Sequence, residues 1–152
     1  MPGSHLRLRP LAISCTTFAV FFLLSLGPVR AQNAKPGSGI TGHYSARSRS
    51  AENSLDVQLL PDGKVKIYLY ASWIGSVATG NVNTGEIRAI LPLSNGRTAL
   101  YESGQCRITI RFAANKVIVR QSAPVGDCGF GLNVSADGTY KKRNRRRPRF
   151  DF

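Results

Sequence analysis

Alternating apolar and polar residues, broken repeatedly by turn sequences, run from Ile40 to Tyr140 and dominate the chain. Successive side chains of a β-strand point to opposite faces, so this alternation predicts strands with one buried face. No window of a dozen residues shows the apolar period of a helix. The pattern therefore predicts an all-β fold, a small antiparallel barrel of about eight strands, with a two-sheet sandwich as the alternative.

One hairpin can be predicted in register from its turn, Pro61-Asp62-Gly63. Proline suits the first position of the turn, and glycine adopts the left-handed conformation of a three-residue loop. Counting back from the turn places both apolar rows on one face, which a slip of one residue would destroy. The predicted pairs are Leu59 with Val65, Val57 with Ile67, and Leu55 with Leu69.

A second hairpin is predicted around a turn at 113–116, with apolar residues again on one face. Its outward positions carry Arg107, Thr109 and Arg111, with Arg120 opposite Thr109. Further strands are expected at 40–45, 85–93, 98–102, 130–134 and 139–140. The inward row of the hairpin is Cys106, Ile108, Ile110, Phe112, Val117 and Val119.

The first 31 residues have the composition of a signal peptide. Arg7 and Arg9 precede an apolar segment over 11–26, and Val29-Arg30-Ala31 places small residues where a signal peptidase cleaves. About 20 apolar residues are needed to span a bilayer, and this segment is shorter and interrupted. We therefore expect cleavage before Gln32, rather than a retained anchor, and a periplasmic or secreted protein.

Two cysteines, Cys106 and Cys128, remain after the predicted cleavage. Cys15 does not fit a lipidation site, because it precedes the apolar core instead of following it. An oxidising compartment favours a structural disulfide between the remaining pair. A reactive or metal-binding pair is the alternative. His43, however, is the only histidine left after the predicted cleavage and so the only possible nitrogen ligand.

The positive charge is distributed unevenly. Without the predicted signal peptide, 18 basic and 8 acidic residues remain, a net charge of +10. Seven of the basic residues lie within 141–149, whereas the body over 32–140 has a net charge of only +4. We therefore divide the chain into a signal peptide (1–31), a linker (32–39), a β-barrel domain (40–140) and a basic tail (141–152).

The basic tail is expected to be disordered when free, because its charges repel one another and it cannot bury apolar surface. Outside the cytoplasm it would attract anionic lipid, lipopolysaccharide, polysaccharide or nucleic acid. A solubilising extension without a partner is the alternative. The candidate anion-binding residues are Lys141, Lys142, Arg143, Arg145, Arg146, Arg147 and Arg149.

A possible secondary patch combines arginines with aromatic residues. Tyr68 and Tyr70 alternate with the inward residues of their strand and are predicted on an exposed face, with Trp73 nearby. Aromatic side chains there could stack on sugars or bases; the alternative is that they cap the barrel or pack under a loop. The arginines of this patch are Arg107, Arg111 and Arg120, which could equally form a solvated face.

Catalytic interpretations lack the necessary residues. Ser-His-Asp or Cys-His catalysis would depend on His43, the one histidine of the mature chain. The acidic residues are scattered, and no two form an acid–base couple from sequence. We expect no catalytic residue, no metal and no small-molecule cofactor, so the protein is not predicted to be an enzyme.

The segments Cys128-Gly129-Phe130-Gly131 and Gly138-Thr139-Tyr140-Lys141, together with Gly42-His43-Tyr44 and the stretch 101–112, resemble small exported bacterial β-barrel domains, most of them without an assigned function. Some of these domains are similar to periplasmic inhibitors of lysozyme or proteases. The resemblance covers most of the body and not the tail, and no inhibitory loop residue can be matched.

Two functions follow as hypotheses. The first is a non-catalytic, monomeric binding module that engages anionic envelope or extracellular material through the basic tail. The second is a periplasmic inhibitor of a secreted hydrolase, either lysozyme or a protease, that acts through loops at one end of the barrel.

Overall fold

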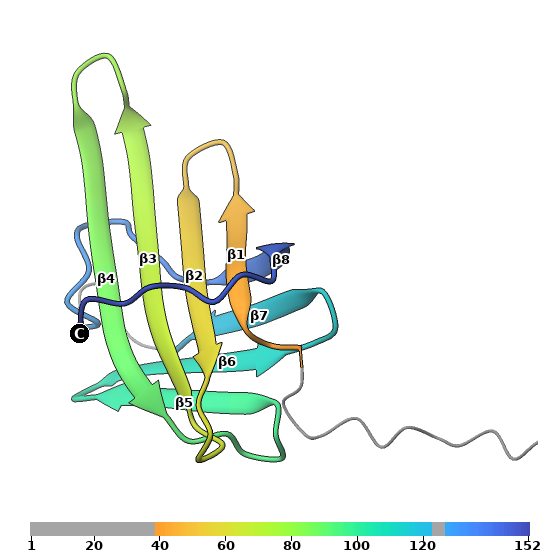
Figure 1. Cartoon of the computed structure of the whole chain (residues 1–152). Helices are drawn as coiled ribbons and strands as arrows, with labels where there is room; N and C mark the ends of the chain where they lie inside the picture. The colour runs from red at the N-terminus through yellow and green to blue at the C-terminus, as the bar shows by residue number, and fades with distance from the viewer. Residues whose placement is uncertain (1–38, 123–126) are drawn as a thin grey trace, which may run out of the picture. The chain divides into compact units, whose positions relative to one another are not determined.

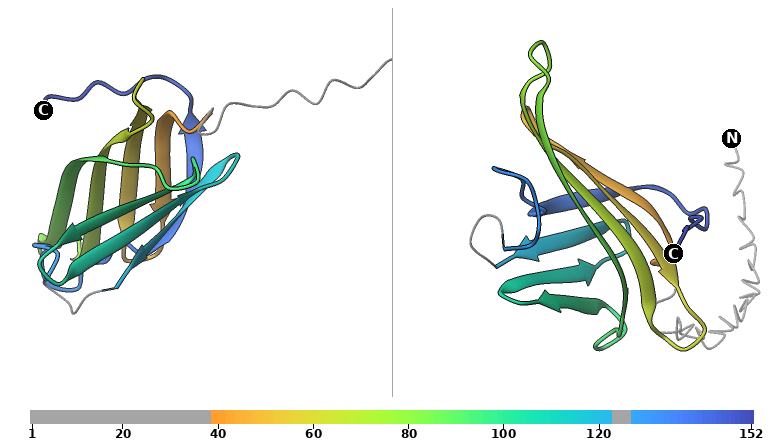
Figure 2. Two further views of the ribbon diagram at one scale, coloured as in Figure 1. Left: turned by 90° about the horizontal axis from the view of Figure 1, so that it is seen from below. Right: turned by 90° about the vertical axis from the view of Figure 1, so that its left-hand side faces the viewer.

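The computed structural model describes residues 39–122 and 127–152, so the predicted signal peptide and nearly all of the linker lie outside the described residues. Eight antiparallel strands form one sheet in the order β4-β3-β2-β1-β8-β7-β6-β5 (Figure 1). The sheet curls into a nearly closed barrel, which confirms the predicted fold class (Figure 2). The strands are β1 (Gly42–Arg47), β2 (Glu52–Leu59), β3 (Val65–Ser76), β4 (Asn81–Leu91), β5 (Thr98–Ser103), β6 (Cys106–Phe112), β7 (Lys116–Gln121) and β8 (Gly138–Asn144).

Both predicted hairpins are confirmed in register. Strands β2 and β3 pair as predicted: Leu59 with Val65, Val57 with Ile67, and Leu55 with Leu69. Strands β6 and β7 place Thr109 opposite Arg120. The inward rows of all four strands are buried, except that Leu59 at the end of β2 is partly buried against the core. None of the described residues belongs to a helix long and apolar enough to cross a membrane.

The strand predicted at 130–134 is wrong, because these residues belong to a loop over the end of the barrel. Two left-handed residues interrupt an extended chain here: Gly129, just before the segment, has φ +69°, and Asn133, within it, has φ +64°. The buried ring of Phe130 lies directly on Gly85 of β4, where an added Cβ would come within 2.1 Å of it. The loop therefore seals the barrel end instead of adding a strand.

The loop is attached to both halves of the sheet, at β6 and at β4. The predicted disulfide joins Cys106, at the start of β6, to Cys128 of the loop. At β4, the amide of Gly131 donates to the carbonyl of Thr84 at 3.0 Å. This loop therefore connects the two halves of the barrel, whose edge strands β4 and β5 do not pair.

Two tyrosines are fully buried on neighbouring strands and close the core in the same way. The hydroxyl of Tyr44 donates to the carbonyl of Ile40 at 2.6 Å, and that of Tyr140 to the carbonyl of Ala136 at 2.8 Å. Each bond runs to the residue four positions earlier and satisfies a hydroxyl that burial would otherwise leave without a partner. Burial raises the pKa of Tyr44 to about 12 and also raises the pKa of Tyr140.

We expect the protein to lose stability steeply above pH 10. A tyrosine in the unfolded chain ionises near pH 10, whereas Tyr44 and Tyr140 stay protonated in the fold, so the unfolded state binds fewer protons and gains population as pH rises. Each tyrosine contributes a slope of about 1.4 kcal/mol per pH unit. Urea unfolding at pH 8, 10 and 11 measures this slope, and Tyr44→Phe should roughly halve it. Equal stability at all three values would contradict the assignment.

The predicted boundary after Tyr140 is also wrong. Strand β8 continues to Asn144, so the first four residues of the expected tail belong to the barrel. Lys141, Lys142 and Asn144 pair with β1, and Arg143 lies at an irregularity in this pairing. The remaining residues, 145–152, cross the outer face of β1–β4 instead of extending away from the domain (Figure 1). We call this segment the strap.

Candidate anion-binding face

The outward side chains of β6, β7 and β8 form a strongly basic surface. Six of the nine outward positions carry a cation, and the other three are Thr109, Ile118 and Thr139. None of the nine carries a carboxylate. We call the six cations the basic face: Arg107, Arg111, Lys116, Arg120, Lys141 and Arg143.

Two lysines of the basic face lie directly opposite each other. Lys116 of β7 pairs with Lys141 of β8, and Lys141 in turn pairs with Ser45 of β1. Like charges at such positions destabilise a sheet, because their Cβ atoms are about 5 Å apart. Arg143 extends the same positive surface and donates from Nε to the hydroxyl of Ser45 at 2.6 Å. An anion bound to both lysine side chains, on the outer surface of the sheet, would relieve the repulsion between them.

Most carboxylates elsewhere on the described barrel form an ion pair or a hydrogen bond with a neighbouring residue. Glu102 accepts from Arg107 at 2.6 Å, which leaves Arg107 the one member of the basic face in an ion pair within the described residues. Asp137, the last residue of the loop before β8, accepts from the backbone amide of Gln121 at 2.8 Å. The other five cations of the basic face are therefore available to an external anion.

The predicted tail residues divide into two sets. Lys141 and Arg143 lie on the basic face, whereas Lys142 turns to the barrel end, where its ammonium donates to the carbonyl of Gly39. Burial, together with the charge of Arg145, lowers the pKa of Lys142. The strap carries the second set, Arg145, Arg146, Arg147 and Arg149, all exposed.

The predicted secondary patch is not brought together. Tyr68 and Tyr70 point outward from β3, as expected, but Trp73 lies on the opposite side of that strand and packs against the core. Three strands separate β3 from β7 in the sheet, so the tyrosines are remote from the arginines of β6 and β7. The interpretation of Trp73 as part of an exposed cluster is therefore wrong.

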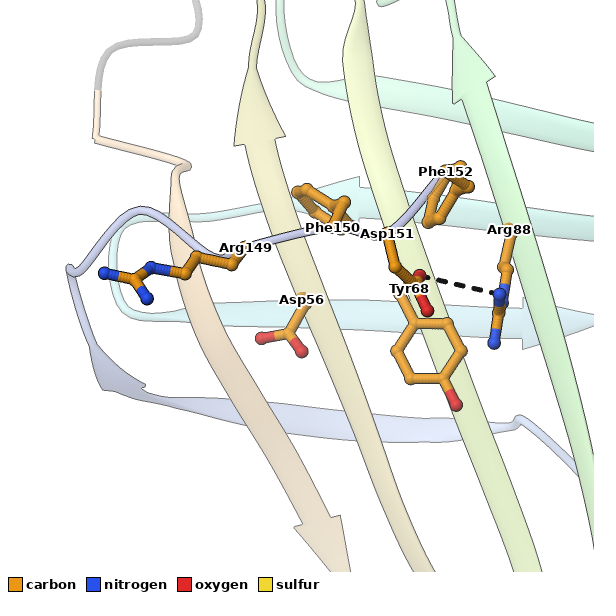
Figure 3. A pocket seen from close by; sticks show the side chains of 7 residues that line it. All are labelled: Asp56, Tyr68, Arg88, Arg149, Phe150, Asp151 and Phe152. Carbon is orange, nitrogen blue, oxygen red and sulfur yellow. Dashed lines mark ion pairs between the residues drawn. The ribbon is translucent and has the colours of Figure 1, made fainter.

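A groove that the sequence did not indicate lies where the strap crosses β2–β4 (Figure 3). It has a volume of about 440 Å³. Its rim includes Arg88, which forms ion pairs with Glu86 at 3.4 Å and with Asp151 of the strap at 3.5 Å. The groove is lined by Asp56, Tyr68, Arg88, Arg149, Phe150, Asp151 and Phe152.

His43 pairs with Asp56 at 2.8 Å on the outer face of β1 and β2. In the part of the chain that the structure describes, no serine or threonine hydroxyl is hydrogen-bonded to this histidine, so a nucleophile–base pair is missing. Residues 39–122 and 127–152 also contain no group of three or more His, Cys, Asp or Glu side chains arranged to hold a metal ion.

Comparisons with known proteins add no relative: no family model, no curated protein and no solved structure matches the chain.

Proposed function

We propose that the protein is a non-catalytic binding module that holds an anionic polymer on the basic face and the arginines of the strap. The observation that carries the proposal is the outward surface of β6–β8, where cations occupy six of nine positions without a carboxylate. These cations lie on adjacent hydrogen-bonded strands, which are about 4.8 Å apart, so a polyanion can neutralise several of them at once. The attraction is electrostatic and needs no particular sequence in the ligand.

The partner that we propose is anionic material outside the cytoplasm, in the envelope or the extracellular medium. The signal-peptide pattern of the first 31 residues supports export, and the disulfide between Cys106 and Cys128 is compatible with it. Lipopolysaccharide and acidic polysaccharide both have the required charge. We propose that the protein acts there as a monomer.

Neutralising part of the basic face should weaken polyanion binding by roughly ten- to hundredfold at low salt. The basic-face variant replaces Arg111, Lys116, Lys141 and Arg143 by glutamine. The control variant makes the same replacement at four exposed cations elsewhere. Calorimetric titration with a heparin hexasaccharide measures both, and equal affinities would contradict the proposal. The control positions are Arg47, Arg49, Lys64 and Arg97.

A second candidate function is inhibition of a secreted hydrolase, and the hairpin of β3 and β4 favours it. This hairpin projects beyond the rest of the barrel (Figures 1 and 2). It carries no charged residue from Ile67 to Gly85, and Val77 at its tip is 79% exposed. Such a narrow, uncharged finger could enter an enzyme cleft. The basic-face variant separates the two functions, because inhibition through the finger would survive it.

A further inference from the structure

The groove beneath the strap is built by two parts of the chain that are distant in sequence. Tyr68 and Arg88 come from the outer face of β3 and β4, where they are direct cross-strand partners. Phe150 and Phe152 come from the strap, with ring centres 5.4 Å apart in an edge-to-face arrangement. Figure 3 shows the tyrosine ring and the Asp56 carboxylate on the sheet, below the two phenylalanines.

Several contacts hold the strap in place and thereby keep the groove open. The ammonium of Lys66 lies 4.3 Å from the ring centre of Phe152 and 5.3 Å from that of Phe150, within the range of a cation–π interaction. Asp151 pairs with Arg88 at 3.5 Å. Arg147 lies against the side-chain amide of Gln58. The strap is thus attached through aromatic, ionic and polar contacts.

The polar groups of the groove are oriented before any ligand arrives. His43 holds Asp56 at 2.8 Å, and the hydroxyl of Tyr68 donates to Glu86 at 2.7 Å. That hydrogen bond raises the pKa of Tyr68. The groove therefore combines aromatic rings with fixed carboxylate and guanidinium groups, and preorganisation lowers the cost of binding.

This combination suits a hydroxylated ring. Aromatic faces cover the apolar side of a sugar, and carboxylates accept hydrogen bonds from its hydroxyls. Asp56 and Asp151 would repel any anionic group in the groove itself, so the charged groups of a polymer would have to lie outside it, against the arginines. Arg149 lines the groove and belongs to the arginines of the strap, so positive charge continues from the groove along the strap.

We infer that the groove binds one sugar ring of an anionic polysaccharide whose charged groups occupy the basic face and the strap arginines. The inference rests on the proposed function and names its ligand class. The basic face supplies attraction for any polyanion, whereas the groove selects a polymer made of sugar rings.

The test compares Tyr68→Thr with Tyr70→Thr, which removes the neighbouring outward tyrosine of the same strand, outside the groove. Calorimetry uses three probes on the mature chain: a heparin hexasaccharide, a linear polyphosphate and a hexathymidylate. Tyr68→Thr should weaken hexasaccharide binding about three- to tenfold and leave polyphosphate binding unchanged. Tyr70→Thr should change neither, and thermal unfolding controls for the fold of both variants.

Three outcomes would overturn the inference. If Tyr68→Thr binds the hexasaccharide and the polyphosphate as the wild type does, the groove is not the sugar site, and the proposed function stays intact. If Tyr68→Thr loses binding of hexathymidylate and of neither other probe, the groove stacks nucleic-acid bases and not sugar rings. Wild-type protein that binds none of the three probes would refute the proposed function, and the inference with it.

Discussion

Replacing both Cys106 and Cys128 by alanine should lower the melting temperature by about 12–24 °C. The bond joins residues 22 positions apart, and closing a loop of that length restricts the unfolded chain by about 3 kcal/mol in the chain-entropy model. A change of 1 kcal/mol shifts the melting point of a domain of about 100 residues by roughly 4–8 °C. Differential scanning calorimetry measures the shift directly.

The position of the bond indicates which part of the barrel loosens first. It holds the loop that places Phe130 over Gly85 of β4. Reduction of the wild-type protein should reproduce the shift, and reductant should leave the double alanine variant unchanged. A melting temperature that does not move in either case would show that the packing of Phe130 and Val134 holds the loop without the bond.

The parts of the fold that the sequence predicts best combine two agreeing signals. At Pro61-Asp62-Gly63 the turn chemistry and the apolar alternation define the same register, and the structure has that register. The same alternation places Trp73 on the inner side of β3, together with Leu69, so parity along the strand could have separated it from Tyr68 and Tyr70.

The errors arise where charge or glycine conceals the strand pattern. Lys141, Lys142 and Arg143 are all basic, so no apolar alternation marks the continuation of β8 beyond the buried Tyr140. In the predicted strand at 130–134 the apolar residues suggested a sheet, but Gly131 and the left-handed Asn133 turn the chain across the barrel end.

The strap illustrates how tertiary contacts override composition. Seven cations in nine residues predict disorder when 141–149 is considered alone. The attachment depends on Lys66 and Arg88, which belong to distant strands and receive Phe150, Asp151 and Phe152. The groove depends on the same long-range contacts, and the local sequence contains no signal for it.

The cations of β8 also change how the site must be dissected. Deletion of 141–152 would remove half of β8 and its pairing with β1, so loss of binding would be confused with damage to the barrel. Deletion of 145–152 removes the strap arginines and leaves β8 complete. The arginines of the strap and the basic face can therefore be tested separately.

The salt dependence of polyanion binding tests the central claim most directly. The measurement uses a short duplex DNA as the ligand. For this ligand, each neutralised phosphate contributes about −0.9 to the slope of the logarithm of the binding constant against the logarithm of salt concentration. With about half of the exposed cations of the basic face and strap engaged, we expect a slope of roughly −3 to −5. The basic-face variant and the 145–152 deletion should each remove a share of it, and the control variant should remove none. A slope near zero in the wild type, or an equal slope in all four proteins, would contradict the account.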